Sequence, residues 1–175
     1  MITTSREIEE RAVERVADLM CVAARTAPKA KGVDNLVTMI VKAREKDQLA
    51  ETMRRLAKEH GTTSFVRDAD NVDKAALIVL LGQIVQPLGC NPCGFCGFSN
   101  CAECAANHSL CAISVADLGI AAGSAVNAAA LHHVDNRIMY TIGKAALEMN
   151  LFDDNIQLAY GIPLSISGKN PFFDR

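Results

Sequence analysis

Six of the seven cysteines of this 175-residue chain lie within the 22 residues from Cys90 to Cys111. Their spacing is Cys90-x2-Cys93-x2-Cys96-x4-Cys101-x2-Cys104-x6-Cys111. Two-residue gaps let neighbouring thiolates converge on one metal centre while the backbone between them turns. Gly94 and Gly97 flank Cys96 and can adopt positive φ, so their amides can point at sulfur. Residues 87–112 are therefore predicted to form a metal-thiolate segment.

Iron–sulfur clusters and zinc are the two candidates for this segment. A structural zinc site usually has two separated cysteine pairs and needs four ligands, whereas these cysteines are nearly contiguous and number six. The ferredoxin-type run C-x2-C-x2-C-x3-C-P is matched at its first three positions. Its fourth position fails, because Cys101 follows after four residues and Ala102 replaces the proline. We expect an iron–sulfur cluster, keep zinc as the alternative, and do not expect a plain bacterial ferredoxin fold.

Composition restricts the kind of protein that carries this segment. Half of the residues are hydrophobic, 22% are charged and the formal net charge is −2, which is typical of a globular protein and disfavours nucleic acid as a partner. The charged N-terminal sequence MITTSREIEERAVERV is not expected to be a signal peptide, which favours a reducing cytoplasm. The apolar stretch from Cys111 to Leu131 contains Asp117, Asn127 and many alanines, so we expect a buried helix and no membrane span.

Helical periodicity predicts four helices. These are Thr4–Arg25, Glu45–His60, Ser114–Leu131 and Arg137–Met149, and in the last of them Ile138 and Tyr140 leave a strand possible. Apolar runs predict strands over Leu36–Val41 and Ala75–Leu81, the second buried on both faces. The tail, residues 161–175, is expected to be extended, with Phe172 and Phe173 exposed. This order of elements predicts an α/β or α+β architecture in a single domain spanning residues 1–175.

The stretch CGFCGFSNC resembles the C-x2-C-G-x3-C signature of 4Fe-4S domains in corrinoid and acetyl-CoA pathway proteins. The resemblance implies a 4Fe-4S cluster bound by Cys93, Cys96 and Cys101, with Cys111 as the best fourth ligand. Cys90 and Cys104 are then spare thiols or alternative ligands.

Four longer segments extend the resemblance over most of the chain. CNPCGFCGFSNCAECA, ISVADLGIAAGSAVNAA, IGKAALEM and GIPLSISGKNPFFDR together resemble an uncharacterised family with a ferredoxin domain. This resemblance implies iron–sulfur binding and supplies no reaction.

A third resemblance concerns the fold. AARTAPKAKGVDN, the strand at Ala75, DLGIAAGSAVNAAAL and AYGIPLS look like a reduced flavin-dependent nitroreductase. It implies an α+β, nitroreductase-like domain into which the cysteine-rich loop is inserted. It also implies FMN, with the phosphate near Arg25, Lys29 and Lys31 and the isoalloxazine near Asn35. Basic residues after a helix more commonly compensate the helix C-terminus, and that alternative stays open.

These observations predict a redox or electron-transfer protein with an unidentified redox partner. A flavin-linked oxidoreductase, a redox or metal sensor without turnover, and a structural zinc protein are the three forms considered, so whether it is an enzyme stays open. A homodimer is expected from the nitroreductase resemblance and from Gly119 and Gly123 on one helix surface. Ala121, Ala122 and Ala125 are expected to extend that small-residue surface.

Overall fold

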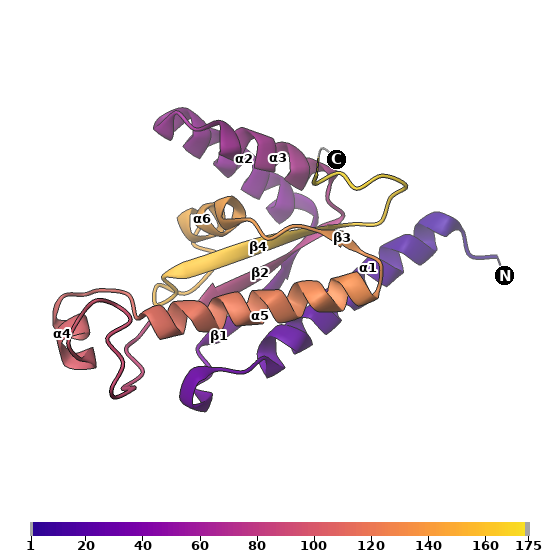
Figure 1. The fold of residues 1–175 in the computed structure, drawn as a ribbon. Helices are drawn as coiled ribbons and strands as arrows, with labels where there is room; N and C mark the ends of the chain where they lie inside the picture. The colour runs from indigo at the N-terminus through magenta and orange to yellow at the C-terminus, as the bar shows by residue number, and fades with distance from the viewer. Residues whose placement is uncertain (1, 174–175) are drawn as a thin grey trace.

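The computed structural model describes residues 2–173, so Met1, Asp174 and Arg175 at the ends of the predicted domain and tail lie outside the described residues. The helices are α1 (Ser5–Thr26), α2 (Ala43–His60), α3 (Thr63–Lys74), α4 (Cys101–Ala106), α5 (Ala112–Leu131) and α6 (Tyr140–Glu148), with a short 3-10 turn η1 (Ala30–Gly32) (Figure 1). The strands are β1 (Leu36–Val41), β2 (Leu77–Gln83), β3 (Asp135–Asn136) and β4 (Leu158–Ser165).

Strand β2 is the centre of the sheet. The four strands lie in the order β1-β2-β4-β3 and every neighbouring pair is antiparallel. Val79 of β2 stands opposite Ile40 of β1 and Ile162 of β4. All seven residues of β2 are buried, which confirms the prediction of a strand covered on both faces.

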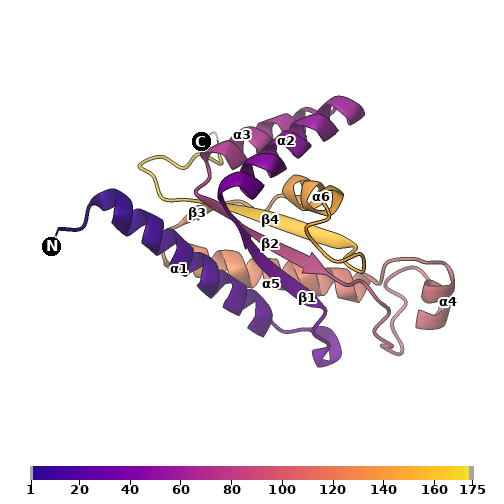
Figure 2. The same cartoon turned by 180° about the vertical axis from the view of Figure 1, so that it is seen from behind.

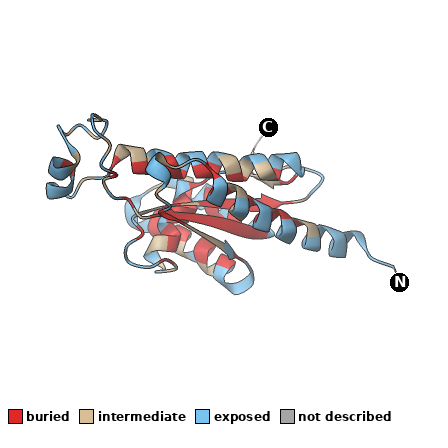
Figure 3. Cartoon of the chain, turned by 90° about the horizontal axis from the view of Figure 1, so that it is seen from below, coloured by how far each residue is buried: buried red, intermediate tan, exposed pale blue. Residues whose placement is uncertain are grey.

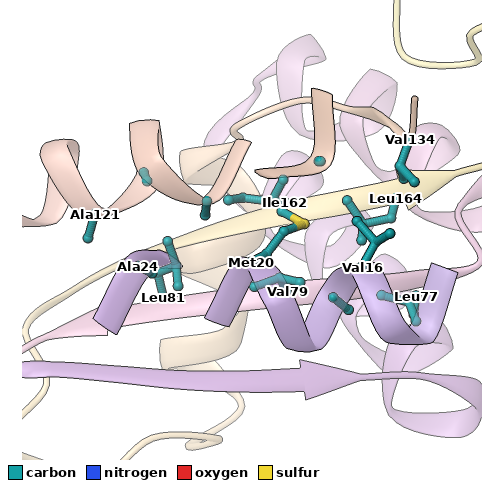
Figure 4. Packing of buried hydrophobic residues seen from close by; sticks show 14 of the residues in the cluster. Val16, Met20, Ala24, Leu77, Val79, Leu81, Ala121, Val134, Ile162 and Leu164 are labelled. Carbon is teal, nitrogen blue, oxygen red and sulfur yellow. The ribbon is translucent and has the colours of Figure 1, made fainter. Parts of the chain in front are cut away.

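Helices cover both faces of the sheet in two layers (Figures 1 and 2). Helices α1 and α5 pack on one face, and α2, α3 and α6 pack on the other. Side chains alternate along β2, so Val79 faces Met20 of α1 while Leu80 faces the opposite layer. Figure 4 shows Met20 between α1 and the strands. This arrangement is the predicted α+β architecture.

Helix α5 is long and apolar enough, by length and composition, to cross a membrane. In the fold it packs against α1 and β2 with seven buried residues. The carboxylate of Asp117, 5% exposed, accepts hydrogen bonds from the backbone N–H of Ala30 at 3.1 and 3.2 Å. The charge that disfavoured a membrane span therefore has a defined partner inside the fold.

The small residues of α5 divide between two faces. Ala121, Ala122 and Ala125 were predicted on an exposed surface, and this was wrong, because all three are buried against α1 and the sheet of their own chain. Gly119 and Gly123 are exposed, and a Cβ at either position would meet nothing within 4 Å. The homodimer stays a prediction.

Two helices were missed by the sequence analysis and one was placed too early. Helix α3 starts two residues after Gly61, whose left-handed conformation ends α2, and α4 lies inside the cysteine segment. Helix α6 begins at Tyr140 because the residues just before it join the sheet: β3 pairs with β4, and Met139 forms a bridge with Gly161. The prediction of a helix from Arg137 was therefore wrong at its start.

The C-terminal segment is docked, which corrects the expectation that Phe172 is exposed. Phe172 is 1% exposed. Its carbonyl accepts a hydrogen bond from Arg137 at 3.0 Å, and its N–H donates to the Asn170 side chain at 2.9 Å. Arg137 also lies over the ring of the half-buried Phe173, 5.1 Å from its centroid.

We expect Gly143→Ala to destabilise the protein by about 3 kcal/mol or more, because a Cβ there would overlap the backbone carbonyl of Ala159 and push α6 off β4. The melting temperature should fall by about 6–12 °C. Gly168→Ala is the matched control, since a Cβ at Gly168 would meet nothing within 4 Å. Equal melting temperatures for the two variants, measured by circular dichroism, would contradict the close packing of α6 on β4.

Candidate metal centre

The cysteine segment, residues 84–111, leaves the sheet at the end of β2 and returns as the start of α5. It extends beyond the end of the sheet and carries the short helix α4 (Figure 1). Most of its residues are exposed or half-buried, as Figure 3 shows at the end of the molecule. The segment therefore stands apart from both hydrophobic layers.

Local hydrogen bonds give the segment its shape. Gly94 and Gly97 both have positive φ, as their type allows, and the N–H of Gly97 donates to the carbonyl of Gly94 at 3.0 Å. This turn holds Cys96 between the two glycines. Asn100 caps α4 by accepting a hydrogen bond from Glu103 N–H at 2.9 Å. The Glu103 carboxylate accepts one from the N–H of Ser99, the residue before the cap, at 2.8 Å, which ties α4 to the preceding turn.

The capped helix places Cys101 and Cys104 three residues apart, which puts them on one face of α4. Cys111 is the residue that precedes α5, and it is buried against Val85 and Leu88. The two ends of the segment thus meet at an apolar base next to the sheet.

A cavity of about 280 Å³ lies inside the segment. Its walls include all six cysteines of the predicted cluster: Cys90, Cys93, Cys96, Cys101, Cys104 and Cys111. A water molecule in the liquid occupies about 30 Å³, so the cavity volume is several times that of one water molecule. Of the residues that line the cavity in the described part of the chain, none is a lysine, arginine, histidine or carboxylate.

Cys104 is the most enclosed of these thiols, at 1% exposure, and it donates a hydrogen bond to the Ser109 carbonyl at 3.4 Å. Burial, the largest cause, raises the pKa of the Cys104 thiol to about 11 together with a hydrogen bond to Cys96 and the nearby charges of Cys96, Cys111 and Cys101. Without metal the thiol is therefore protonated at neutral pH, and metal binding must release that proton.

Across residues 2–173, no three side chains of His, Cys, Asp or Glu close on one point as they do around a single bound ion. The cysteines surround a cavity instead. His108, the histidine nearest to the cysteines in sequence, is exposed and is not among the cavity-lining residues. Cys21 is half-buried on α1, packs against the layer formed by α1 and α5, and lies outside the site.

The residues predicted to hold FMN gather where α1 leads into β1. Lys29 has a side chain only 5% exposed, and its ammonium donates to the carbonyls of Ala24, Arg25 and Ala27 at 3.2, 2.6 and 3.1 Å. Lys29 therefore caps the end of α1, which is the helix-compensating role left open above. Arg25 donates to Asp34 at 2.7 Å and to the Leu36 carbonyl at 2.6 Å.

Lys31 and Asn35 complete that group. Lys31 adopts a left-handed conformation with φ 56°, and its ammonium lies 3.6 Å from where a Cβ at Gly89 would stand. Asn35 is 8% exposed and accepts a hydrogen bond from the Gln86 side chain at 3.3 Å. Its amide nitrogen, Nδ2, is buried without a hydrogen-bond partner among the described residues.

Three residues that shape the base of the site were not singled out as functional from the sequence. Ser114, at the start of α5, accepts from Gln83 at 3.3 Å and donates to the Ile84 carbonyl at 3.3 Å. Asp117 ties the η1 turn to α5. The sequence signal for Asp117 was an acid inside an apolar helix. The neutral side chains of Ser114 and Gln83 gave no such signal.

Known proteins resemble the chain in both sequence and fold. Residues 107–175 match the profile of a family described as "uncharacterized protein containing a ferredoxin domain". An uncharacterized protein of Archaeoglobus fulgidus is 38% identical over 183 aligned residues, which cover 100% of this chain and 98% of the relative.

Solved structures of nitroreductases have the same fold. A nitroreductase family protein from Clostridium novyi aligns with a TM-score of 0.60 and 15% identity, covering 99% of this chain and 79% of its own. A nitroreductase with bound FMN from Desulfitobacterium hafniense aligns with a TM-score of 0.59 and 14% identity, covering 97% and 81%. A protein from Bacteroides thetaiotaomicron described as "putative NADH dehydrogenase/NAD(P)H nitroreductase" aligns with a TM-score of 0.59 and 15% identity, covering 93% of this chain and 80% of its own.

These likenesses confirm the predicted nitroreductase-like fold and the resemblance to ferredoxin-domain proteins. The cysteine segment up to Ala106 precedes the matched profile residues, but the alignment with the full-length relative extends across it. The chain therefore belongs to the family of proteins described as containing a ferredoxin domain.

Proposed function

We propose that this protein is an iron–sulfur protein with a redox, electron-transfer role. The observation that carries the proposal is the cavity of about 280 Å³ lined by all six clustered cysteines. Thiolates are the ligands of iron–sulfur clusters, and the description of the family supports the same assignment.

The size of the cavity favours a cluster over zinc. A single zinc ion is held by four ligands that close directly upon it, at about 2.3 Å for sulfur. Here six thiols surround a space several times larger than a water molecule. A multi-iron cluster uses such a space, and its iron count is proposed to be four.

The position of the segment suits electron exchange with another molecule. It projects from the end of the sheet, and Phe95 at its surface is 76% exposed. A bound cluster would accept and release single electrons, while the surrounding chain holds it in place and limits contact with water. The redox partner is unidentified, and we propose a reducing cytoplasm as the location.

We expect protein purified without oxygen to be brown, with visible absorption bands and about four irons per chain. The measurements are an absorption spectrum together with metal analysis for iron and zinc. A colourless anaerobic preparation with stoichiometric zinc would contradict the proposal and favour the structural zinc protein.

The identity of the fourth ligand is part of the proposal. We propose Cys96, Cys101 and Cys111 as three of the ligands. The motif resemblance adds Cys93, whereas Cys104 lines the same cavity and is the most enclosed of the six thiols, at 1% exposure. We therefore propose that Cys104 competes with Cys93 for the fourth position, with Cys90 as a spare thiol.

We expect Cys96→Ser, Cys101→Ser and Cys111→Ser each to abolish the visible spectrum, because each removes a shared ligand. Cys104→Ser should lose more iron than Cys93→Ser. Cys21→Ser is the control and should keep the cluster, since Cys21 is a half-buried residue of α1, outside the cysteine segment. If Cys93→Ser bleaches the protein while Cys104→Ser does not, the assignment from the motif is restored.

A flavin-linked oxidoreductase is the second candidate function. The fold supports it, since one of the solved nitroreductases contains FMN. The site residues fit only in part: Arg25 and Lys29 are engaged within their own chain, so a phosphate would compete with Asp34 and the α1 carbonyls. The unpartnered amide nitrogen of Asn35 and the ammonium of Lys31 are the groups left for a flavin.

If FMN binds, its fluorescence should be quenched on titration with half-saturation in the micromolar range. Asn35→Ala should weaken binding about tenfold through loss of one hydrogen bond. Asn127→Ala, which changes an exposed position of α5, should leave binding unaltered. Absence of quenching at tens of micromolar protein would remove the flavoenzyme and leave the cluster as the redox centre.

A further inference from the structure

The η1 turn is attached to the base of the cysteine segment. Ala30 and Val33, at its two ends, pack on the same small apolar cluster as Cys90 and Cys111. Asp117 of α5 binds the N–H of Ala30 through both carboxylate oxygens, at 3.1 and 3.2 Å. Since Cys111 directly precedes α5, one helix fixes both the turn and one wall of the cavity.

Lys31 is held in this turn in an uncommon conformation. Its φ of 56° and ψ of 15° lie in the left-handed region, which non-glycine residues seldom adopt. The neighbouring Gly32 also has positive φ, and the turn closes with a hydrogen bond from Val33 N–H to the Ala30 carbonyl at 3.2 Å. The ammonium of Lys31 lies 3.6 Å from the Cβ position of Gly89, a residue that lines the cavity beside Cys90.

The surroundings of the cavity are otherwise poor in charge. Between residues 84 and 117 the two residues of type Asp, Glu, Lys or Arg are Glu103 and Asp117. The Glu103 carboxylate accepts from Ser99 N–H before α4, and the Asp117 carboxylate accepts from Ala30 N–H in the η1 turn. A thiolate-bound cluster carries net negative charge and becomes more negative when it takes up an electron. A cation close to the rim therefore acts more strongly on the reduced form than on the oxidised form.

We propose that Lys31 is a tuning residue that raises the reduction potential of a cluster bound in the cysteine cavity. The inference rests on the proposed function, and it assigns Lys31 to the cluster in place of an FMN phosphate. The step is a one-electron reduction: the external reductant loses one electron, the cluster gains it, and no bond or proton changes at Lys31. Removal of the charge should therefore make the cluster harder to reduce.

The test compares wild-type protein with Lys31→Met, both purified without oxygen and titrated with dithionite while the visible spectrum is recorded. The equilibrium constant for reduction should fall about tenfold, which for one electron corresponds to 59 mV. Lys31→Arg should keep the wild-type potential because it keeps the charge. Lys74→Met is the matched control, since Lys74 is exposed at the end of α3, away from the cysteine segment.

A second variant separates charge from backbone conformation. Lys31→Gly removes the ammonium and relaxes the left-handed position, so it should be at least as stable as wild type and still show the lower potential. The difference between wild type and Lys31→Met should also shrink at high salt, as expected for a charge at the surface.

The outcomes distinguish the two proposals. If wild-type protein contains no iron–sulfur cluster, both the proposed function and the role of Lys31 are overturned. If wild type contains the cluster and Lys31→Met has the same potential as Lys74→Met, the role of Lys31 alone is overturned. A shift in Lys31→Met that is absent from Lys31→Gly would assign the effect to local backbone distortion and would likewise overturn it.

Discussion

The burial of β2 on both faces is the constraint on which the rest of the structure depends. A strand with apolar side chains on both sides needs a helical layer on each, and its backbone needs a partner strand at each edge. Strands β1 and β4 supply the partners, and the helices supply the layers. The cysteine segment begins where β2 ends, so the same constraint fixes where the candidate metal centre stands.

Much of this fold could be predicted because its signals are local. Three elements can be recognised from short stretches of sequence: the apolar run of β2, the periodic apolar residues of α1 and the alanine-rich α5. The wrong predictions concern features that depend on contacts between elements distant in the sequence. Nothing near Phe172 in sequence shows that Arg137 will bind its carbonyl, and nothing near Ala121 shows which face of α5 meets α1. Whether two elements dock depends on the residues of both elements, which lie far apart in the sequence.

The candidate site shows the same division. The cysteine pattern alone predicted a metal-thiolate segment, because ligand spacing is a local property. Which thiols lie together depends on the capped turn of α4 and on the anchoring of Cys111 at the start of α5. Lys29 illustrates the opposite case. Its charge suggested an anion site, but in the structure its ammonium donates hydrogen bonds to the carbonyls at the end of α1. A charge in a sequence is available to a ligand only if the fold does not use it first.

The separation of the cysteine segment from both hydrophobic layers has an evolutionary consequence. Its two ends are held side by side by β2 and α5, so the loop between them can change in length or ligand content without repacking the core. The cost of closing such a loop grows only slowly with its length, and a bound metal group supplies cross-links that the loop itself lacks. The two hydrophobic layers therefore set few limits on the sequence of the cysteine segment, and the segment sets few limits on theirs.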